Sequence, residues 1–354
     1  MPTQLPQDLV EEVIDHLAVD HGSLKTCSLI SRAWVSRSRS YLFATCILTP
    51  KNIRSFCDLL QSSTFLSHVR TINASTHFWT QRDRHFNQFA ADLRRLTGVR
   101  ALNVTLSFLT AAASADAAFC IGFAKAFPAI TKLDITCDCE GYLSEAQSPP
   151  LLDLISLFPT LQELSVEAVV HFQMINVPPT VVPPPGLRKV SLGTRVAKPI
   201  LGWLHVTKHL PNLEVITLPY IQWYEGSMMR EQLLQLTGIH TLNISISLSL
   251  GAPTSVLDLS LPPNLTTLDV TAIFPMQAEL HRLISLLSTL PTPALIEHFS
   301  LALHPSWEKA LDWELLDDFL STPQFPRLRS VVLTGPKSSD KMLPLLAARG
   351  VLPV

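Results

Sequence analysis

The chain has 354 residues, of which 47% are hydrophobic and 16% are charged, and its formal net charge is −2. A chain of this length buries about three quarters of its unfolded surface, so its core needs no disulfide or metal ion. The near-neutral charge gives no electrostatic reason to expect nucleic acid or an anionic membrane as a partner. No apolar stretch approaches the ~18 residues of a membrane span, and the six cysteines predict reduced thiols in the cytoplasm or the nucleus.

The first 50 residues predict a small helical domain. Residues 5–17, LPQDLVEEVIDHL, begin with Leu-Pro and place acids near a helix N-terminus, where negative charge is stabilising. Their apolar stripe consists of Leu9, Val13, Ile14 and Leu17. After a break, a second stripe follows at Leu24, Cys27, Ile30 and Trp34. Six basic residues and no acid lie between Lys25 and Cys57, so an acidic first half is joined to a basic second half.

Residues 51–354 are organised by a repeat. After residue 60, an apolar anchor is followed by an apolar residue three positions on and another five positions on. This pattern returns ten times, from VRTINA (69–74) to LRSVVL (328–333). Five consecutive anchors lie 26 residues apart: Leu161, Leu187, Leu213, Ile239 and Leu265. A fixed period of this size is typical of a solenoid.

Each repeat predicts one strand, and many predict a helix after it. The apolar residues of the pattern alternate with polar ones, as in a half-buried strand, and stripes between the strands have helical spacing. About ten such units predict a curved α/β solenoid with strands on its concave side, interrupted by loops at 168–186 and 247–262. The outward strand positions are Asn103, Thr105, Asp134, Thr136, Ser165, Glu167, Ser191, Thr217, Asn243, Ser245, Asp269 and Thr271. This polar face either hydrogen-bonds an extended partner segment or is only a solvated strand face.

The repeat resembles a leucine-rich repeat, with one departure. That family's pattern ends in an Asn or Cys that forms a buried ladder. Here the matching positions hold Asp138, Val169, Arg195, Ile221, Ser247 and Ile273. The resemblance therefore implies an irregular leucine-rich-repeat-like solenoid over residues 51–354.

The helical domain resembles an F-box over about 45 residues. The similarity rests on Leu5-Pro6, Asp8-Leu9, Val13-Ile14 and His16-Leu17, then on Leu24, CSLISR (27–32) and Trp34. SLISRAWVSRSRSYLF (28–43) is similar to the F-box-like domains of mushroom-forming fungi. The resemblance implies that the domain binds the Skp-type adaptor of a cullin–RING ubiquitin ligase while the solenoid recruits a protein substrate. By the same resemblance, the residues that contact or shape the adaptor surface are Leu5, Pro6, Leu9, Leu29, Ile30 and Trp34, with arginines at the rim.

Two other motifs favour structural interpretations. Cys137 and Cys139 suggest a metal site, but strand parity turns both thiols inward and no second cysteine pair lies nearby, so core residues are predicted. The basic and aromatic segment 77–89 could stack on nucleic acid. Its aromatic and leucine residues follow helical spacing through Leu93 and Leu96, which favours a core helix.

The segment YIQWYEG, residues 220–226, concentrates aromatic residues after the sixth strand unit, in a predicted loop. Aromatic anchors dominate the energetics of many protein interfaces. Tyr220, Trp223 and Tyr224 are therefore candidate substrate-binding residues, and packing over the edge of the solenoid is the alternative.

Enzyme motifs are missing from the sequence: it has no G-x-S-x-G, phosphate-binding glycine loop, H-E-x-x-H or G-x-G-x-x-G. We therefore expect no enzymatic activity, no cofactor and no metal ion. The leading hypothesis is a substrate-recognition adaptor of an SCF-type ligase. The alternative is a non-enzymatic protein-binding scaffold whose helical domain only caps the solenoid, and a hydrolase with a scattered triad is a distant third.

Overall fold

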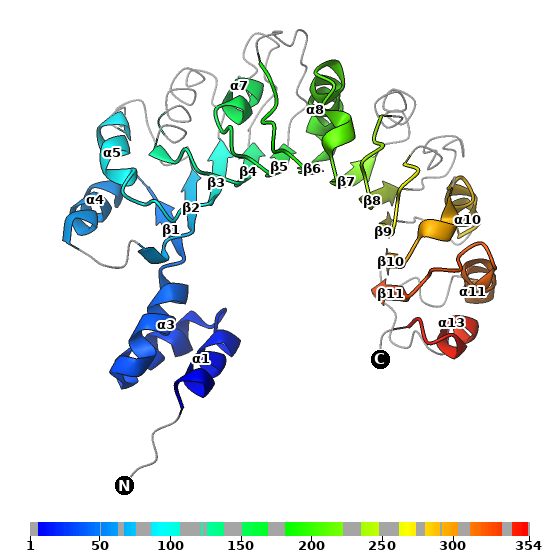
Figure 1. Cartoon of the computed structure of the whole chain (residues 1–354), viewed down its shortest axis with the longest axis horizontal. Helices are drawn as coiled ribbons and strands as arrows, with labels where there is room; N and C mark the ends of the chain where they lie inside the picture. The colour runs from blue at the N-terminus through cyan, green and yellow to red at the C-terminus, as the bar shows by residue number, and fades with distance from the viewer. Residues whose placement is uncertain are drawn as a thin grey trace. The chain divides into compact units, whose positions relative to one another are not determined.

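The structure of the protein is a computed structural model (Figure 1), which describes most of the chain. The described residues are 6–49, 51–62, 67–75, 86–106, 122, 126–137, 151–168, 181–221, 235–247, 262–273, 280–290, 292–303, 312–334 and 342–352. They form two compact units, one of residues 1–162 and 184–186 and the other of residues 163–183 and 187–354.

The first unit begins with a bundle of three helices. These are α1 (Gln7–His16), α2 (His21–Ile30) and α3 (Arg32–Leu42). Asp20 accepts hydrogen bonds from the backbone N–H groups of Gly22 and Ser23 and so caps α2. The bundle has its own small core of Val10, Ile14 and Leu24, against which Leu17, Trp34, Tyr41 and Leu42 pack.

Two details of the bundle differ from the sequence prediction. On α1 the buried side consists of Val10 and Ile14, whereas Leu9 and Val13 are exposed, so the predicted stripe was wrong by a rotation about the helix axis. The second stripe was predicted to continue through Ile30 and Trp34. Instead the backbone is extended at Ser31, whose side chain accepts a hydrogen bond from Ala33 N–H and starts a new helix. A serine favours this break because its hydroxyl satisfies a free N–H at the helix start.

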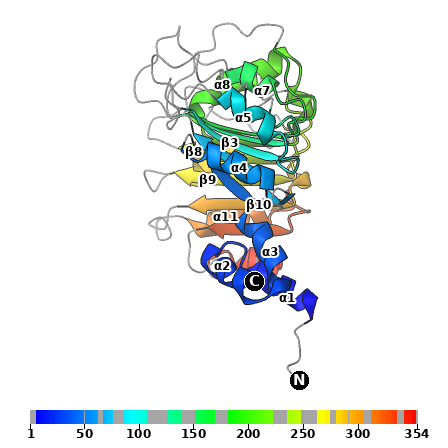
Figure 2. The ribbon, with the colours of Figure 1, turned by 90° about the vertical axis from the view of Figure 1, so that its left-hand side faces the viewer.

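The repeat strands of the first unit follow the bundle directly. They are β1 (Thr45–Leu48), β2 (Thr71–Ser75), β3 (Ala101–Leu106) and β4 (Lys132–Cys137). The described helices that accompany them are α4 (Ile53–Ser62), α5 (Phe86–Leu93) and α7 (Leu151–Ser156). Strand β1 pairs in parallel with β2, so the sheet begins inside the first 50 residues, one strand before the first predicted repeat. Figure 2 shows α3 leading into this part of the sheet.

The second unit carries seven further strands. They are β5 (Glu163–Ala168), β6 (Lys189–Leu192), β7 (Val215–Ile221), β8 (Thr241–Ser247), β9 (Thr267–Ile273), β10 (His298–Leu303) and β11 (Ser330–Thr334). The described helices are α8 (Thr194–Val206), α10 (Leu280–Leu287), α11 (Trp313–Ser321) and α13 (Pro344–Ala348), with short 3-10 turns at Leu210–Asn212 and Pro293–Leu295. Within each unit the strands pair in parallel in chain order. In Figure 1 the helices of the second unit lie on one face of its strands.

The α/β fold class is confirmed, and so is the strand parity. All five anchors at the 26-residue period are at most 2% exposed. The two apolar residues that follow each anchor are buried in the strand, for example Leu164 with Val166 and Leu242 with Ile244. The register keeps these positions in step, since Leu242 lies opposite Leu268 and Ile244 opposite Val270. Identical registers stack each apolar residue on its counterpart in the next repeat, which makes the core continuous within the unit.

The outer edges of strands β1 and β11, which pair with no further strand among the described residues, make hydrogen bonds to residues that follow them in the chain. The Ala44 carbonyl accepts from Thr71 N–H on β2, so by the alternation of a parallel ladder the backbone groups of Ile47 and Thr49 face away from β2. The side-chain amide of Asn52 takes both of them, donating to Ile47 O and accepting from Thr49 N–H at 2.8 Å each. In the second unit, Val331 N–H on the free side of β11 donates to the carbonyl of Val351 at 2.8 Å.

Buried Asp317 on α11 holds the C-terminal segment in place. Its carboxylate accepts hydrogen bonds from the backbone N–H groups of Leu345 at 2.7 Å and Leu346 at 3.0 Å. It therefore satisfies free N–H groups in the first turn of α13. The segment that follows α13 contains Val351, the residue that covers the edge of β11.

Candidate protein-binding surfaces

Apolar side chains lie on the surface of the helical bundle. Leu29 is 86% exposed, Ile30 is 63% exposed and Leu9 is 48% exposed, and Pro6 and Val13 are exposed as well. We call these five residues the bundle face. Gln7 donates a hydrogen bond to the Ala33 carbonyl at 3.5 Å, which brings the first turn of α1 beside the junction of α2 and α3. The bundle core is already formed by Val10, Ile14 and Leu24, so the residues of the bundle face are not needed to fill it.

The candidate adaptor residues fall into three groups. Leu9, Leu29 and Ile30 are exposed and apolar, and Pro6 is exposed immediately before α1. Trp34 is half-buried and packs on the bundle core, where it supports α1 and α2 from within. Leu5 lies outside the described residues.

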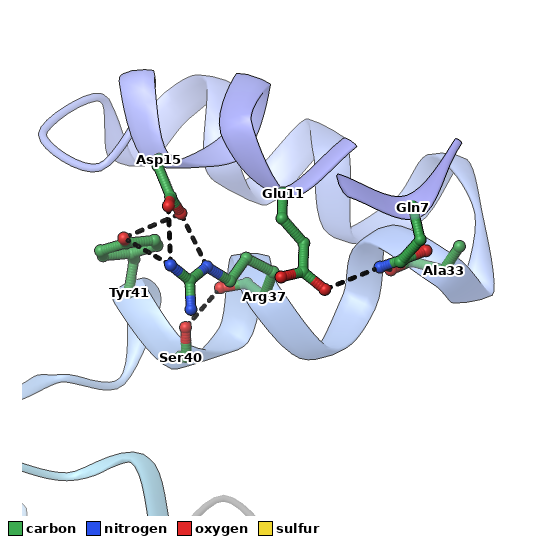
Figure 3. Close-up of polar contacts among 7 residues, drawn as sticks. All are labelled: Gln7, Glu11, Asp15, Ala33, Arg37, Ser40 and Tyr41. Atoms are coloured by element: carbon green, nitrogen blue, oxygen red, sulfur yellow. Dashed lines mark hydrogen bonds and ion pairs between the residues drawn. The ribbon is translucent and has the colours of Figure 1, made fainter. Parts of the chain in front are cut away.

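A polar cluster joins α1 to α3 (Figure 3). Gln7, Glu11 and Asp15 occupy successive turns of α1 and face α3. Arg37 donates two hydrogen bonds to the Asp15 carboxylate, from Nε at 2.6 Å and from Nη2 at 2.7 Å. The hydroxyl of Tyr41 donates to Asp15 at 2.9 Å, and the Arg37 guanidinium lies 5.4 Å from the centre of the Tyr41 ring. Bidentate pairing and a shared third partner give this surface ion pair a fixed geometry, which most exposed pairs lack.

The Asp15–Arg37–Tyr41 cluster was missed from the sequence, where the arginines were expected at the rim of a docking surface. The only hint in the sequence was the acidic first half and basic second half of the helical domain, which could have suggested an ion pair between them. The hydrogen bonds from Arg37 lower the pKa of Asp15, and the hydrogen bond to the Asp15 carboxylate raises the pKa of Tyr41. The same carboxylate raises the pKa of Arg37, which stays charged.

We expect the attachment of α1 to weaken in acid. A carboxyl group with a lowered folded-state pKa contributes stability above its unfolded pKa of about 3.9, and that contribution is lost as the pH falls through the folded-state pKa. Backbone hydrogen exchange in residues 7–16 should therefore become less protected below about pH 4 relative to the anchored strands. Asp15→Asn should show several-fold weaker protection of α1 already at pH 7 and a smaller change on acidification. Glu12→Gln, on the exposed side of α1, is the control and should behave like the native chain; equal pH profiles for Asp15→Asn and the native chain would contradict the role of the cluster.

The open strand face, opposite the helices, carries the polar side chains predicted for it. Ser165, Ser191, Thr217, Asn243 and Asp269 are all partly exposed at successive strands of the second unit. At the strand starts, Lys189 donates to Glu163 at 2.8 Å, and Arg188 pairs with Glu214 on the next repeat. These charges are thus paired with each other, which fits either of the two interpretations of this face, a hydrogen-bonding surface or a solvated one.

The aromatic candidates are only partly described. Tyr220 belongs to β7, which extends to Ile221, so the prediction that it lies in a loop after the strand was wrong. Its side chain, Trp223 and Tyr224 lie outside what the structure describes. Of the irregular connections predicted at 168–186 and 247–262, the structure describes residues 168, 181–186, 247 and 262. Residues 181–186 have no helix or strand, whereas Ala168 is the last residue of β5 and Ser247 the last of β8.

The cysteines of the described residues are core or half-buried thiols. Cys137 is fully buried, as strand parity predicted, and Cys139 lies outside the described residues. Burial raises the pKa of Cys46 and of Cys57 to about 11 each, which keeps these thiols protonated and poorly nucleophilic at neutral pH. Among the described residues, His, Cys, Asp and Glu side chains form no group of three that could hold a metal ion. In the same part of the chain, every helix is too short or too polar to cross a bilayer.

Comparisons with known proteins identify the fold but no family. No protein-family model matches the sequence, and no curated protein matches it. Among solved structures, the leucine-rich repeat-containing protein LegL7 from Legionella pneumophila has a TM-score of 0.52 at 13% identity, covering 86% of this chain and 97% of that one. A protein from Bacteroides fragilis has a TM-score of 0.42 at 14% identity and covers 72% of each chain. The likeness to LegL7 shows the fold alone: the repeat region is leucine-rich-repeat-like.

Proposed function

We propose that the protein is a substrate-recognition adaptor of an SCF-type cullin–RING ubiquitin ligase. In this proposal the bundle face binds a Skp-type adaptor, and the leucine-rich-repeat-like region recruits a protein for ubiquitination. The protein would have no chemistry of its own, because ubiquitin transfer belongs to its partners, and it would act in the cytoplasm or the nucleus. A leucine-rich-repeat-like fold suits a protein-binding scaffold, since its stacked repeats present one long continuous surface.

The exposure of Leu9, Leu29 and Ile30 is the observation that carries the proposal. The F-box resemblance names these residues as adaptor contacts, and they are among the exposed large apolar side chains of the bundle. A group of exposed apolar residues outside a filled core suits contact with a protein partner. Arg37 pairs with Asp15 inside the bundle, and in this proposal apolar contact is the main source of the affinity for the adaptor.

One observation favours the alternative of a capping scaffold. Helix α3 ends at Leu42 and β1 begins at Thr45, so the bundle lies immediately before the first strand of the sheet. Burial of Trp34 against the first repeat, with Pro6 covered as well, would favour capping further. Trp34 instead packs on the core of the bundle itself.

Titration of the full chain with a purified fungal Skp-type adaptor tests the proposal. Saturable 1:1 binding that is lost when the bundle face is altered is expected. If a folded chain binds no adaptor at micromolar concentrations, the ligase proposal fails and the scaffold is the remaining candidate.

A further inference from the structure

The residues that directly follow the repeat anchors form a row along the start of the strands. The backbone N–H of each donates to the carbonyl of its counterpart one strand earlier, at 2.8–3.1 Å. Neighbouring strands are ~4.8 Å apart, so consecutive members of a row are neighbours in space. In the first unit the row consists of Ala44, Arg70, Arg100, Thr131 and Gln162, and in the second unit of Arg188, Glu214, His240, Thr266, Glu297 and Arg329.

The second row neutralises its own arginines. Arg188 pairs with Glu214 on the next strand, and Arg329 pairs with Glu297 on the preceding strand at 3.4 Å. The first row contains two arginines and no acid. Neither of them forms an ion pair with a carboxylate of the described residues. The first row thus presents two positive charges on neighbouring strands, without the glutamates that accompany such charges in the second row.

One turn of the backbone holds both guanidinium groups. Arg100 Nη1 donates to the carbonyls of Thr97 at 2.9 Å and Val99 at 3.0 Å. Arg70 Nη1 lies 3.5 Å from the carbonyl of Gly98, in the same turn. Gly98 leaves the space for it, because a Cβ at this position would collide with Nη1. The turn therefore keeps two like charges close together, which is unfavourable unless an anion lies near them.

Both arginines keep donors for a ligand. Their side chains are exposed, and Nε and Nη2 of each donate to no group among the described residues. A guanidinium carries five N–H donors in one plane, so a single bonded nitrogen leaves an open fork. An oxyanion that reaches both forks would offset the repulsion between them and gain charge-assisted hydrogen bonds.

We propose that Arg70 and Arg100 bind carboxylates of an acidic segment in the protein that the repeat region recruits. The second row shows which partner this position accepts, since each of its arginines is paired with a glutamate. Nucleic acid fits less well, because it requires longer runs of cations or aromatic platforms. Here the pair is flanked in its row by Ala44 and Thr131.

The inference deepens the recruitment part of the proposed function and rests on the repeat region binding a protein. It is independent of whether the bundle binds a ligase adaptor.

The peptide acetyl-Gly-Glu-Gly-Glu-Gly-amide is the probe, because its two carboxylates lie on one side of an extended chain. The same peptide with glutamine in place of glutamate is the neutral isostere. With the full chain labelled with ¹⁵N at arginine, the glutamate peptide should shift the Nε–H signals of Arg70 and Arg100 saturably, and the glutamine peptide should not. Arg70→Gln, followed at the Arg100 signal, should weaken binding about tenfold, because charge-assisted hydrogen bonds are lost.

Arg188→Gln is the matched control, because Arg188 is also exposed and has the same place in its repeat but is paired with Glu214. It should leave the titration unchanged. Arg70→Lys should retain part of the binding, since an ammonium keeps the charge but not the planar fork. The site is overturned if the glutamine peptide binds as well as the glutamate peptide, or if Arg188→Gln weakens binding as much as Arg70→Gln.

Two further ligands test the chemical class. A phosphoserine version of the peptide that binds more than ~tenfold more tightly would assign the pair to phosphorylated segments. A thymidine oligonucleotide that saturates the same signals at lower concentration would assign it to nucleic acid. Either result overturns the proposal. Adaptor titration of Arg70→Gln separates the two proposals: adaptor binding should be unaffected, so either proposal can fail without the other.

Discussion

Replacing Leu213 by alanine is expected to lower the free energy of unfolding of the second unit by about 2–5 kcal/mol, because the missing side-chain atoms leave a cavity in a close-packed core. Leu213 is an anchor of the 26-residue repeat and is 0% exposed, and Leu242 lies on the same inward side of the next strand at 4% exposed. The stacked registers of β7, β8 and β9 leave little room for the neighbours to move into the cavity. Leu242→Ala should therefore have an effect of the same size.

Denaturant unfolding of the full chain, followed by the protection of residues 213–218 and 241–247 against hydrogen exchange, measures this effect locally. Thr241→Ala is the matched control, because Thr241 is partly exposed on the open face beside Leu242, and it should change stability by no more than about 0.5 kcal/mol. Losses below about 1 kcal/mol at both leucines would contradict the inward placement of these anchors.

The second large effect concerns the bundle face. Leu29→Glu should reduce the affinity for a Skp-type adaptor more than tenfold, because truncating or charging a central apolar anchor typically costs at least ~2 kcal/mol. Pro6→Ala combined with Leu9→Ala should abolish detectable capture. Since Leu29 is 86% exposed, its replacement removes little from the bundle core.

Adaptor titrations of the full chain and of these variants measure the effect, with circular dichroism and hydrogen exchange of α1 to show that the bundle stays folded. Val206→Glu is the control, because Val206 is an apolar residue that is 72% exposed at the end of α8, far along the chain from the bundle. Undiminished adaptor binding by folded Leu29→Glu, or equal losses in Val206→Glu, would show that the bundle face is not the docking surface.

The repeat region could be predicted from the sequence because each repeat packs mainly against the repeats before and after it. Each anchor meets the same kind of neighbour one repeat away, so a constant spacing and a constant side-chain type suffice to place it. Strand β1 was assigned to the helical domain because it follows α3 directly, although FATCIL (43–48) has the repeat pattern. Cys46 and Leu48 lie opposite Ile72 and Ala74, which puts Phe43 at the anchor position of Val69. The prediction of a loop at Tyr220 failed for a different reason: β7 continues to Ile221 through Pro219 and Tyr220, which break the apolar alternation in the sequence.

The candidate sites depended on information that spacing does not contain. Which side of α1 is buried is decided by contacts with α2 and α3, so Leu9 and Val13 could not be separated from Val10 by periodicity alone. Asp15 and Arg37 are 22 positions apart in the sequence and meet only because α1 and α3 pack side by side. Asn243 was correctly predicted to lie on the outward side of its strand, but its hydrogen bond with Thr217 on the neighbouring strand could not be predicted from spacing.

The hydrogen bonds made by Asn52 and Val351 bear on how copies of this protein behave when they meet. A parallel sheet with bare outer strands offers a template on which a second chain can add a strand, and repeated addition produces fibres. Asn52 binds two of the outward backbone groups of the β1 edge, and Val351 binds one of β11. These contacts at the two ends of the repeats therefore oppose the addition of strands from other chains. A chain shortened before residue 342 would lack Val351 and would expose the side of β11 that this residue covers.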